Sequence, residues 1–423
     1  MKGRHPPLAQ TPKDSKIRVA VIIQRYFPIF GGAENQCRLL NEYLAKTAKV
    51  AIPFVLTRRI RSDLPRSEKI DRISVIRRGL PGLGCWSGYS FYMFLLLHLL
   101  RQRRKYDIIH CHSTALVGFT AAVVGKILRK PVILKLSTNG ELVTQRGNAA
   151  PKPGILRRCT LRFEHILARF NGRNAHIVAL NEEGKSELET IRATSIHMIP
   201  NGIDSDAFSS PQPGERDLLK RAHGYSAEDI VILFTGRFVE RKGIDLLLDA
   251  FAGLIEKSED GILRRARLCL IGSDELQKES VRGKIEMTLE HYPNAIRTLH
   301  PGNSVVEYLK MADIFAFPSR REGMPNSVLE AFAVGLPCVL SNIAPHLELA
   351  IQNPCADVYF FISNNVSSLQ ETLEFVIRAA ADSKIGRDGV SSEIDPKFQI
   401  DNVAQTYLTL YHTLMRQQIT TNC

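Results

Sequence analysis

Short, continuously apolar runs alternate with longer helical patterns along most of the chain, which leaves few folds open to it. Strands are predicted at residues 17–23, 50–56, 73–76, 108–111, 132–136 and 177–180. A turn-rich loop with Pro28, Gly31 and Gly32 follows the first strand, and an amphipathic helix is predicted from about 34 to 46. Because uniformly apolar strands separated by helices are typical of a parallel sheet covered on both faces, this half predicts a doubly wound α/β domain.

The same alternation starts again after a segment rich in Ser, Pro and Gly at 204–217, which we interpret as a linker. Further strands are predicted at residues 230–234, 268–271, 314–317 and 337–340. A chain of 423 residues is long enough for two cores of about 200 residues each. We expect a disordered tail at 1–15, a first domain at 16–205, a second at 206–398 and a separate last helix at 399–416. Two such domains form a cleft, and ligands bind beyond the carboxyl ends of their strands.

The composition is that of a folded, basic protein. Hydrophobic residues make up 44% of the chain and charged residues 23%, which excludes a disordered protein. The formal charge of +13 favours a negatively charged partner: a phosphorylated small molecule, an anionic membrane surface or nucleic acid. The 8 cysteines include no C-x-x-C pair, and residues 1–15 lack the apolar segment of a secretory signal. We therefore expect the protein in the cytoplasm or on the cytoplasmic face of a membrane.

Residues 89–100 form a nearly unbroken apolar run, followed by Arg101, Arg103, Arg104 and Lys105. The run is well short of the about 20 residues that span a bilayer. One interpretation is a helix packed in the first domain with a solvated basic end. The other is a peripheral membrane contact, with the apolar face among lipid headgroups and the basic cluster on anionic lipid. The sequence leaves both open.

A potential anion site lies in the segment PSRREGMPNSVLE at 318–330. A predicted strand ends just before it, and Pro325 is a suitable first residue for a helix. The amides of Asn326, Ser327 and Val328 would then be unpaired donors in the first helical turn. Such a helix N-terminus favours bound anions.

Two carboxylates flank this helix start. Glu322 lies in the loop before it, and Glu330 about one turn inside it. Each carboxylate is a bidentate acceptor for vicinal hydroxyls, so the pair could bracket a ligand whose phosphates sit on the helix end. By spacing alone, the alternative is two solvated glutamates beside a helix start.

With this segment the chain resembles the retaining GT-B glycosyltransferases of family 4, also called group 1. The E-x7-E spacing of Glu322 and Glu330 is followed by AFAVGLP at 331–337, similar to the family's E-A-x-A-x-G-x-P continuation. IPNGID at 199–204 resembles the turn at its domain junction, and FTGRFVERKG at 234–243 its G-R-x4-K-G phosphate-binding segment. The resemblance implies two Rossmann-like domains facing a central cleft, and a C-terminal helix that crosses back to the first domain.

The resemblance also implies roles for residues of the second domain. Arg237 and Lys242 would grip the donor diphosphate, whose charge grows as the glycosidic bond breaks. Glu330 would bind the nucleotide ribose. Glu322 would contact the donor sugar and steady the positive charge at its anomeric carbon. Gly236, beside Arg237, and the amides at 326–328 complete the predicted nucleotide-binding set.

In the first domain, DIIHCH at 107–112 ends a predicted strand and places His112 at the rim of the cleft. In the family, the second histidine of such an H-x-H touches the donor sugar. His110 and His112 point to one face and could suggest a metal, but no third ligand is evident nearby, so we predict no metal site and interpret His110 as a core residue. Gly31 and Gly32 match the family's glycine pair, whose backbone approaches phosphate or acceptor; an ordinary turn would also favour glycine here.

Two segments depart from the family pattern. STNG at 137–140 stands where the family often has a histidine–glycine pair, and GSDE at 272–275 where it has a glycine-rich turn. Both bear on the donor, so the sugar and the nucleotide stay open.

The function implied is transfer, with retention, of a hexose-type sugar from a nucleoside-diphosphate sugar to a glycan or lipid-linked saccharide, with no cofactor and no required Mg²⁺. The acceptor would bind the first domain, where basic and apolar residues alternate at helical spacing; a packed surface helix is the alternative. Those basic residues are Arg157, Arg158, Arg162 and Arg169. Rival functions are an epimerase or phosphorylase on the same fold and a non-catalytic nucleotide-sugar-binding protein. The basic residues are dispersed, which argues against specific nucleic-acid binding.

Overall fold

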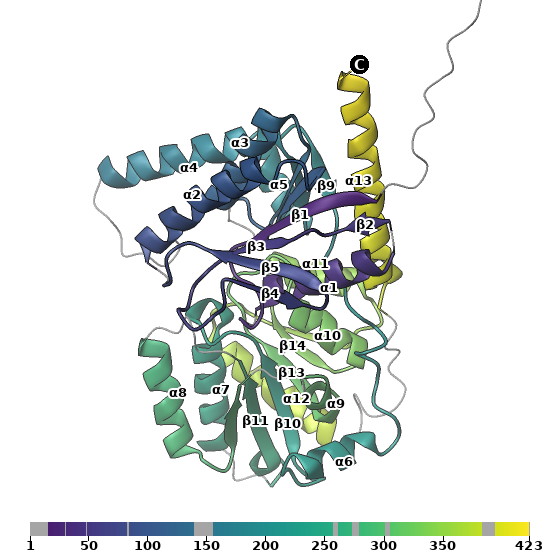
Figure 1. Ribbon diagram of the computed structural model, residues 1–423. Helices are drawn as coiled ribbons and strands as arrows, with labels where there is room; N and C mark the ends of the chain where they lie inside the picture. The colour runs from purple at the N-terminus through teal and green to yellow at the C-terminus, as the bar shows by residue number, and fades with distance from the viewer. Residues whose placement is uncertain are drawn as a thin grey trace, which may run out of the picture.

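The computed structural model describes residues 16–29, 31–47, 49–82, 84–138, 155–256, 261–272, 279–300, 305–382 and 394–422. They form two α/β domains, one above the other in Figure 1, with the last helix running along the side of the first domain. Each domain is built on one predominantly parallel sheet.

The first sheet has the strand order β4-β5-β3-β1-β6-β7-β8-β9, with β2 also paired to β1. Its strands are β1 (Ile17–Ile23), β2 (Val50–Ala51), β3 (Val55–Arg58), β4 (Ser67–Ile70), β5 (Ile73–Arg78), β6 (Ile108–Cys111), β7 (Val132–Lys135), β8 (His176–Ala179) and β9 (Ile196–Met198). Its helices are α1 (Gly32–Lys46), α2 (Cys85–Arg101), α3 (Leu116–Leu128), α4 (Ile155–Asn174) and α5 (Glu182–Thr190). All described pairings are parallel except that of the edge strand β4 with β5.

Alternate residues of the strands feed the cores on opposite faces of this sheet, because successive strand side chains point to opposite sides. In β1, Ala20 and Ile22 pack with α2, α3 and α4, whereas Val19 and Val21 pack with α1 and the last helix, α13 (Ile400–Asn422). The buried stripe of α13 includes Tyr407 and Tyr411. The C-terminal helix therefore completes the first domain, as expected.

The second sheet has the strand order β12-β11-β10-β13-β14-β15, and all its described pairings are parallel. Its strands are β10 (Ile230–Thr235), β11 (Ala266–Ile271), β12 (Ile296–Leu299), β13 (Ile314–Phe317), β14 (Cys338–Ser341) and β15 (Val358–Phe361). Its helices are α6 (Glu215–Ala222), α7 (Ile244–Glu256), α8 (Glu279–His291), α9 (Val305–Met311), α10 (Asn326–Val334), α11 (Ala344–Gln352) and α12 (Val366–Ala381). Three short 3₁₀ turns are η1 (Glu240–Lys242), η2 (Leu263–Arg265) and η3 (Pro396–Phe398). Every residue of the central strand β10 is buried, as its uniformly apolar sequence predicts.

The structure corrects several predicted boundaries. The strand predicted at 50–56 is two strands, β2 and β3, separated at Pro53, which has no N–H to donate to a sheet. The predicted linker ends early because α6 begins at Glu215, and the last helix continues to Asn422 instead of ending at 416. Strands β4, β9, β12 and β15 were not predicted; all four are edge strands, and none is fully buried, although the sequence VYFF of β15 is as apolar as that of a central strand.

The chain passes between the domains twice, and the two connections touch. Ile203 donates its backbone N–H to the carbonyl of Phe398 at 2.7 Å and accepts from the N–H of Ile400 at 2.9 Å. Gly202 lies against Ile400, where an added Cβ would come within 2.6 Å of a side-chain carbon. Glycine is thus required for this close approach.

Helix α2, which contains the 89–100 run, has a buried face and an exposed face. One face, with Phe91, Leu95 and Leu99, is buried in the first domain. The other face is apolar and exposed. In the part of the chain that the structure describes, no helix is both long and apolar enough to cross a membrane.

Candidate active site

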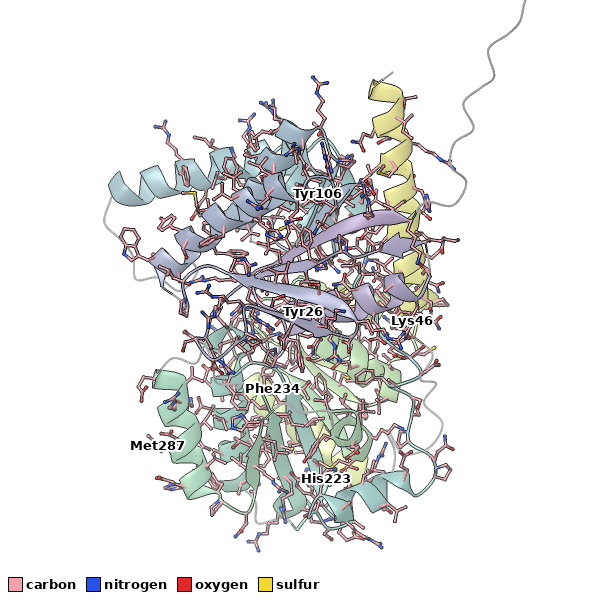
Figure 2. The ribbon with its side chains drawn as sticks, in the orientation of Figure 1. Tyr26, Lys46, Tyr106, His223, Phe234 and Met287 are labelled. Carbon is pink, nitrogen blue, oxygen red and sulfur yellow. The ribbon has the colours of Figure 1, made fainter. Side chains whose placement is uncertain are left out.

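A cleft of about 650 Å³ lies between the carboxyl ends of the two sheets. Tyr26, just after β1, and Phe234, near the end of β10, mark the facing edges of the two domains in Figure 2. The volume lies in the range of sites for small molecules and cofactors. Residues from both domains line it, so a ligand here would contact both.

All but one of the sequence-predicted site residues line this cleft. The first domain supplies Gly31, Gly32 and His112. The second domain supplies Gly236, Arg237, Lys242, Glu322, Asn326, Ser327 and Glu330. Residues far apart in the chain meet there; Asn326, for example, donates its side-chain amide to the carbonyl of Gly32, 294 positions earlier, at 2.9 Å.

Val328 is the exception, and its prediction is wrong. Its side chain is fully buried in the second core, and its amide donates to the carbonyl of Pro325 at 3.1 Å. Pro325 is the N-cap of α10 rather than its first residue, so the first turn begins one residue later than predicted. The N-cap Pro325 and the first two residues of the helix, Asn326 and Ser327, line the cleft.

Lys242 and Glu322 form an ion pair with each other. The Lys242 ammonium lies 2.7 Å from Oε1 of Glu322, and Arg241 lies 3.3 Å from the same oxygen. Burial alone would raise the pKa of Glu322, but the two cations lower it to about 2. Burial lowers the pKa of Lys242 to about 8, so both groups are charged at neutral pH.

The position of Lys242 depends on the glycine that follows it. Gly243 has φ of 69°, and a Cβ on it would lie 1.9 Å from the carbonyl oxygen of Pro318. Only glycine combines that conformation with that contact. The tight turn brings η1 against the loop that carries Glu322.

Arg237 and Glu330 are the charged residues of the predicted set that are not paired with another side chain of the described residues. In the described part of the chain, neither side chain has a hydrogen bond or ion pair. Burial lowers the pKa of the Arg237 guanidinium and raises that of the Glu330 carboxyl to about 7. A partly buried cation and a partly buried carboxylate without partners suit a ligand that brings both anionic and hydroxyl groups.

The two histidines have different surroundings, as predicted: His110 lies in the core and His112 at the cleft. His110 is fully buried, and its Nδ1 lies 2.8 Å from the hydroxyl of Tyr411 on α13, so it is a core residue. His112 stacks on it with ring centroids 4.5 Å apart and lines the cleft, and its Nε2 has no hydrogen-bond partner among the residues that the structure describes. Burial lowers the pKa of His112 well below its ordinary value, which keeps the ring neutral. Among the described residues, no three potential ligands lie close enough to hold a metal ion.

The glycine pair lies where α1 begins. A Cβ on Gly31 would come within 2.3 Å of a carboxylate oxygen of Glu34, and one on Gly32 within 3.5 Å of the Asn326 amide. Gly31 has φ of −179°, an extended conformation open to any residue, and the atom that a Cβ would meet is the end of the Glu34 side chain, so neither conformation nor backbone contact requires glycine there.

Sequence reasoning missed several cleft residues: Arg25, Glu34, Lys135 and Arg241. Lys135 ends β7 at the same sheet edge as His112, a signal that the sequence carried. Arg241 directly precedes the predicted site residue Lys242, so the sequence also carried a signal for it. Arg25 and Glu34 pair with each other at 3.3 Å and have no such signal.

Several predicted positions fall outside what is described. Of the two departures from the family pattern, only Ser137, Thr138 and Gly272 lie within the described residues, and all three line the cleft. In the basic stretch of α4, the side chains of Arg157 and Arg158 lie outside the described part.

Comparisons with known proteins agree with this architecture. The model for glycosyl transferases group 1 matches residues 215–384, and the model for glycosyltransferase family 4 matches residues 30–207. A putative glycosyltransferase, EpsF, of Bacillus subtilis is 33% identical over 318 residues, covering 74% of this chain and 76% of that protein.

Two solved structures share the fold at low sequence identity. Sucrose-phosphate synthase from Thermosynechococcus elongatus superimposes with a TM-score of 0.76 at 18% identity, covering 95% of this chain and 100% of that one. HepE from Anabaena in complex with UDP-glucose superimposes with a TM-score of 0.65 at 15% sequence identity, covering 96% of this chain and 99% of that one. With family models on both domains and a relative of one third identity across three quarters of its length, the chain belongs to the group 1 glycosyltransferases and has the GT-B fold.

Proposed function

We propose that the protein is a retaining glycosyltransferase that moves a hexose-type sugar from a nucleoside-diphosphate sugar to a glycan or lipid-linked saccharide. The observation that carries this proposal is the convergence of Arg237, the N-terminus of α10 and Glu330 on one cleft. A guanidinium and a helix N-terminus bind a diphosphate, and a free carboxylate binds a ribose diol. HepE, which shares the fold, was solved with UDP-glucose.

The charges in the cleft suit the departure of a nucleoside diphosphate. Negative charge grows on the leaving phosphate as the glycosidic bond breaks, so cations fixed beside it stabilise the transition state more than the ground state. Arg237 and Lys242 supply this charge without Mg²⁺. Glu322, held by Lys242 and Arg241, would face the positive charge that develops on the sugar.

Binding of nucleotide sugars tests this proposal. A panel of UDP-, GDP- and ADP-sugars is screened for thermal stabilisation, because a ligand that binds only the folded state raises its Tm. At least one donor should raise Tm, and Glu330→Ala and Lys242→Ala should each remove that shift. Lys69→Met, at an exposed position on β4, is the control and should keep it. No response to any donor or free nucleotide would contradict the proposal, and conversion of a donor into a different nucleotide sugar without an acceptor would indicate an epimerase.

We also propose that the acceptor is presented at an anionic membrane that the protein binds through α2. The exposed face of α2 carries Trp86, Tyr89, Met93, Phe94 and Leu97, which are 83%, 62%, 60%, 46% and 55% exposed. Four exposed basic residues follow at 101–105. An exposed apolar stripe beside a basic cluster suits an anionic lipid surface.

Trp86 is the single tryptophan of the chain, so its fluorescence reports this contact directly. Vesicles with anionic lipid should shift its emission to shorter wavelength, and neutral vesicles should do so less. Replacing both Phe94 and Leu97 by Ser should abolish the shift. Met287→Ser, at a 68% exposed position on α8 (Figure 2), should leave it unchanged. An unshifted spectrum at low salt would contradict membrane binding.

A further inference from the structure

Lys135 is a buried cation in the cleft that the mechanism above does not use. It is the last residue of β7, its side chain is 4% exposed, and it lines the cleft. Its ammonium lies 5.7 Å from the ring centroid of Tyr407, and Cys37 is also near. Within the described residues, this ammonium has no carboxylate partner and no hydrogen bond.

The sheet register places Lys135 beside His112. Strands β6 and β7 pair in parallel with His110 opposite Ile133 and Cys111 opposite Leu134. The next pair in that register is His112 and Lys135, whose side chains share a face on strands about 4.8 Å apart. The two unpartnered nitrogen groups, Nζ of Lys135 and Nε2 of His112, therefore lie together at the first-domain wall of the cleft.

An unpaired buried charge is costly, and two other largely buried lysines, Lys220 and Lys242, have carboxylate partners. Lys220 is 1% exposed, and its ammonium lies 2.6 Å from Asp313 and donates to the carbonyl of Asp229 at 2.8 Å. Lys242 is similarly paired with Glu322. Burial lowers the pKa of Lys135 to about 8, so it stays positive at neutral pH without a partner. A counter-charge brought by a ligand accounts for this difference.

We propose that Lys135 binds a carboxylate on the donor sugar, and that the donor is a nucleoside-diphosphate uronic acid. This inference rests on the proposed function. Arg237 and the N-terminus of α10 occupy the second-domain wall, where the diphosphate would bind. The sugar then extends toward the first-domain wall, where His112 and Lys135 lie. A neutral hexose would offer Lys135 only hydroxyls, whereas a carboxylate supplies the missing charge.

Matched donor pairs test this assignment by isothermal titration calorimetry. UDP-glucuronate is compared with UDP-glucose, and GDP-mannuronate with GDP-mannose, alongside free UDP and GDP. A charge-assisted hydrogen bond contributes about 1.5–3 kcal/mol, so the acid of the accepted nucleotide should bind roughly 10- to 150-fold more tightly than its neutral partner. Lys135→Met should remove this preference while binding of free nucleotide is retained.

A second readout is the stability of the ligand-free protein. Lys135→Met removes an unpaired buried charge and should raise Tm, whereas the exposed control Lys69→Met should not. Equal binding of acid and neutral donors by the parent, or a preference for the acid that persists in Lys135→Met, would overturn the assignment. If no free nucleotide binds the parent at all, the proposed function fails as well, so the two failures are distinguishable.

Discussion

The ion pair between Lys242 and Glu322 yields a prediction that a double-mutant cycle measures directly. Two unit charges 2.7 Å apart attract by about 6 kcal/mol at an effective dielectric constant of about 20, before the cost of desolvation. Removing one partner of a buried pair typically costs about 3–5 kcal/mol, because the other charge is left unpaired. The two side chains keep 13% and 5% of their surface exposed, so we expect Glu322→Gln to cost about 3 kcal/mol.

The two single variants are not equivalent. Glu322→Gln leaves both Lys242 and Arg241 without their carboxylate, whereas Lys242→Met leaves Glu322 with Arg241 at 3.3 Å. Lys242→Met should therefore cost less than Glu322→Gln. The double variant should be more stable than Glu322→Gln alone, with a coupling energy of about 2 kcal/mol.

Differential scanning calorimetry of the ligand-free variants is the assay. In a domain of this size each kcal/mol shifts Tm by about 2–4 °C, so Glu322→Gln should lower Tm by about 6–12 °C. Lys284 and Asp249 form an exposed pair at 2.5 Å and serve as the control cycle, with a coupling energy below about 1 kcal/mol. Additive effects at Lys242 and Glu322, or equal coupling in the two cycles, would refute the reasoning.

Three further predictions concern the cleft and its support. Burial raises the pKa of Glu330 from 4.5 to about 7, so between these pH values the folded chain holds a proton that the unfolded chain has lost. The stability of the folded protein therefore falls as pH rises through this window. Glu330→Gln should flatten this part of the Tm–pH curve and weaken nucleotide binding. Arg237→Met should weaken binding of free nucleoside diphosphate by roughly 10- to 150-fold by calorimetry, with little change in Tm, because no described partner of Arg237 is lost. Tyr411→Phe removes the 2.8 Å contact with buried His110 and should cost about 1–3 kcal/mol by thermal unfolding, with nucleotide binding retained.

The central strands and the cleft could be predicted from the sequence because both depend on local sequence pattern. Strands β10 and β13 are short, uniformly apolar and bounded by polar turns, so their place inside a parallel sheet follows from composition alone. The carboxyl ends of such strands meet at one edge of a sheet, which is why His112 could be placed at the cleft before its contacts were known. Arg237 and Glu322 were assigned to the cleft by the resemblance to family 4.

What the pattern could not supply is the pairing between side chains from separate turns. The Lys242–Glu322 contact depends on the left-handed turn at Gly243 and its fit against Pro318. The paired amide of Val328 depends on Pro325 lying outside the helix, a shift of one residue that sequence boundaries do not resolve. The edge strand β4 has the sequence SEKI, whose residues alternate between exposed and half-buried positions. Such a mostly polar strand cannot be distinguished from a loop by its sequence.

The contact between Ile203 and its neighbours at 398 and 400 has a mechanical consequence. Two separate linkers would let the domains slide as well as turn. Because the two connections are hydrogen-bonded to each other at one point, they act as a single hinge. The simplest opening of the cleft is therefore a rotation of the domains about that hinge. The N-terminal tip of α10 lies beside this hinge, where Asn201 donates its side-chain amide to Asn326 at 2.7 Å, so it would move little. Residues far from the hinge would travel furthest when a donor enters or a nucleotide leaves.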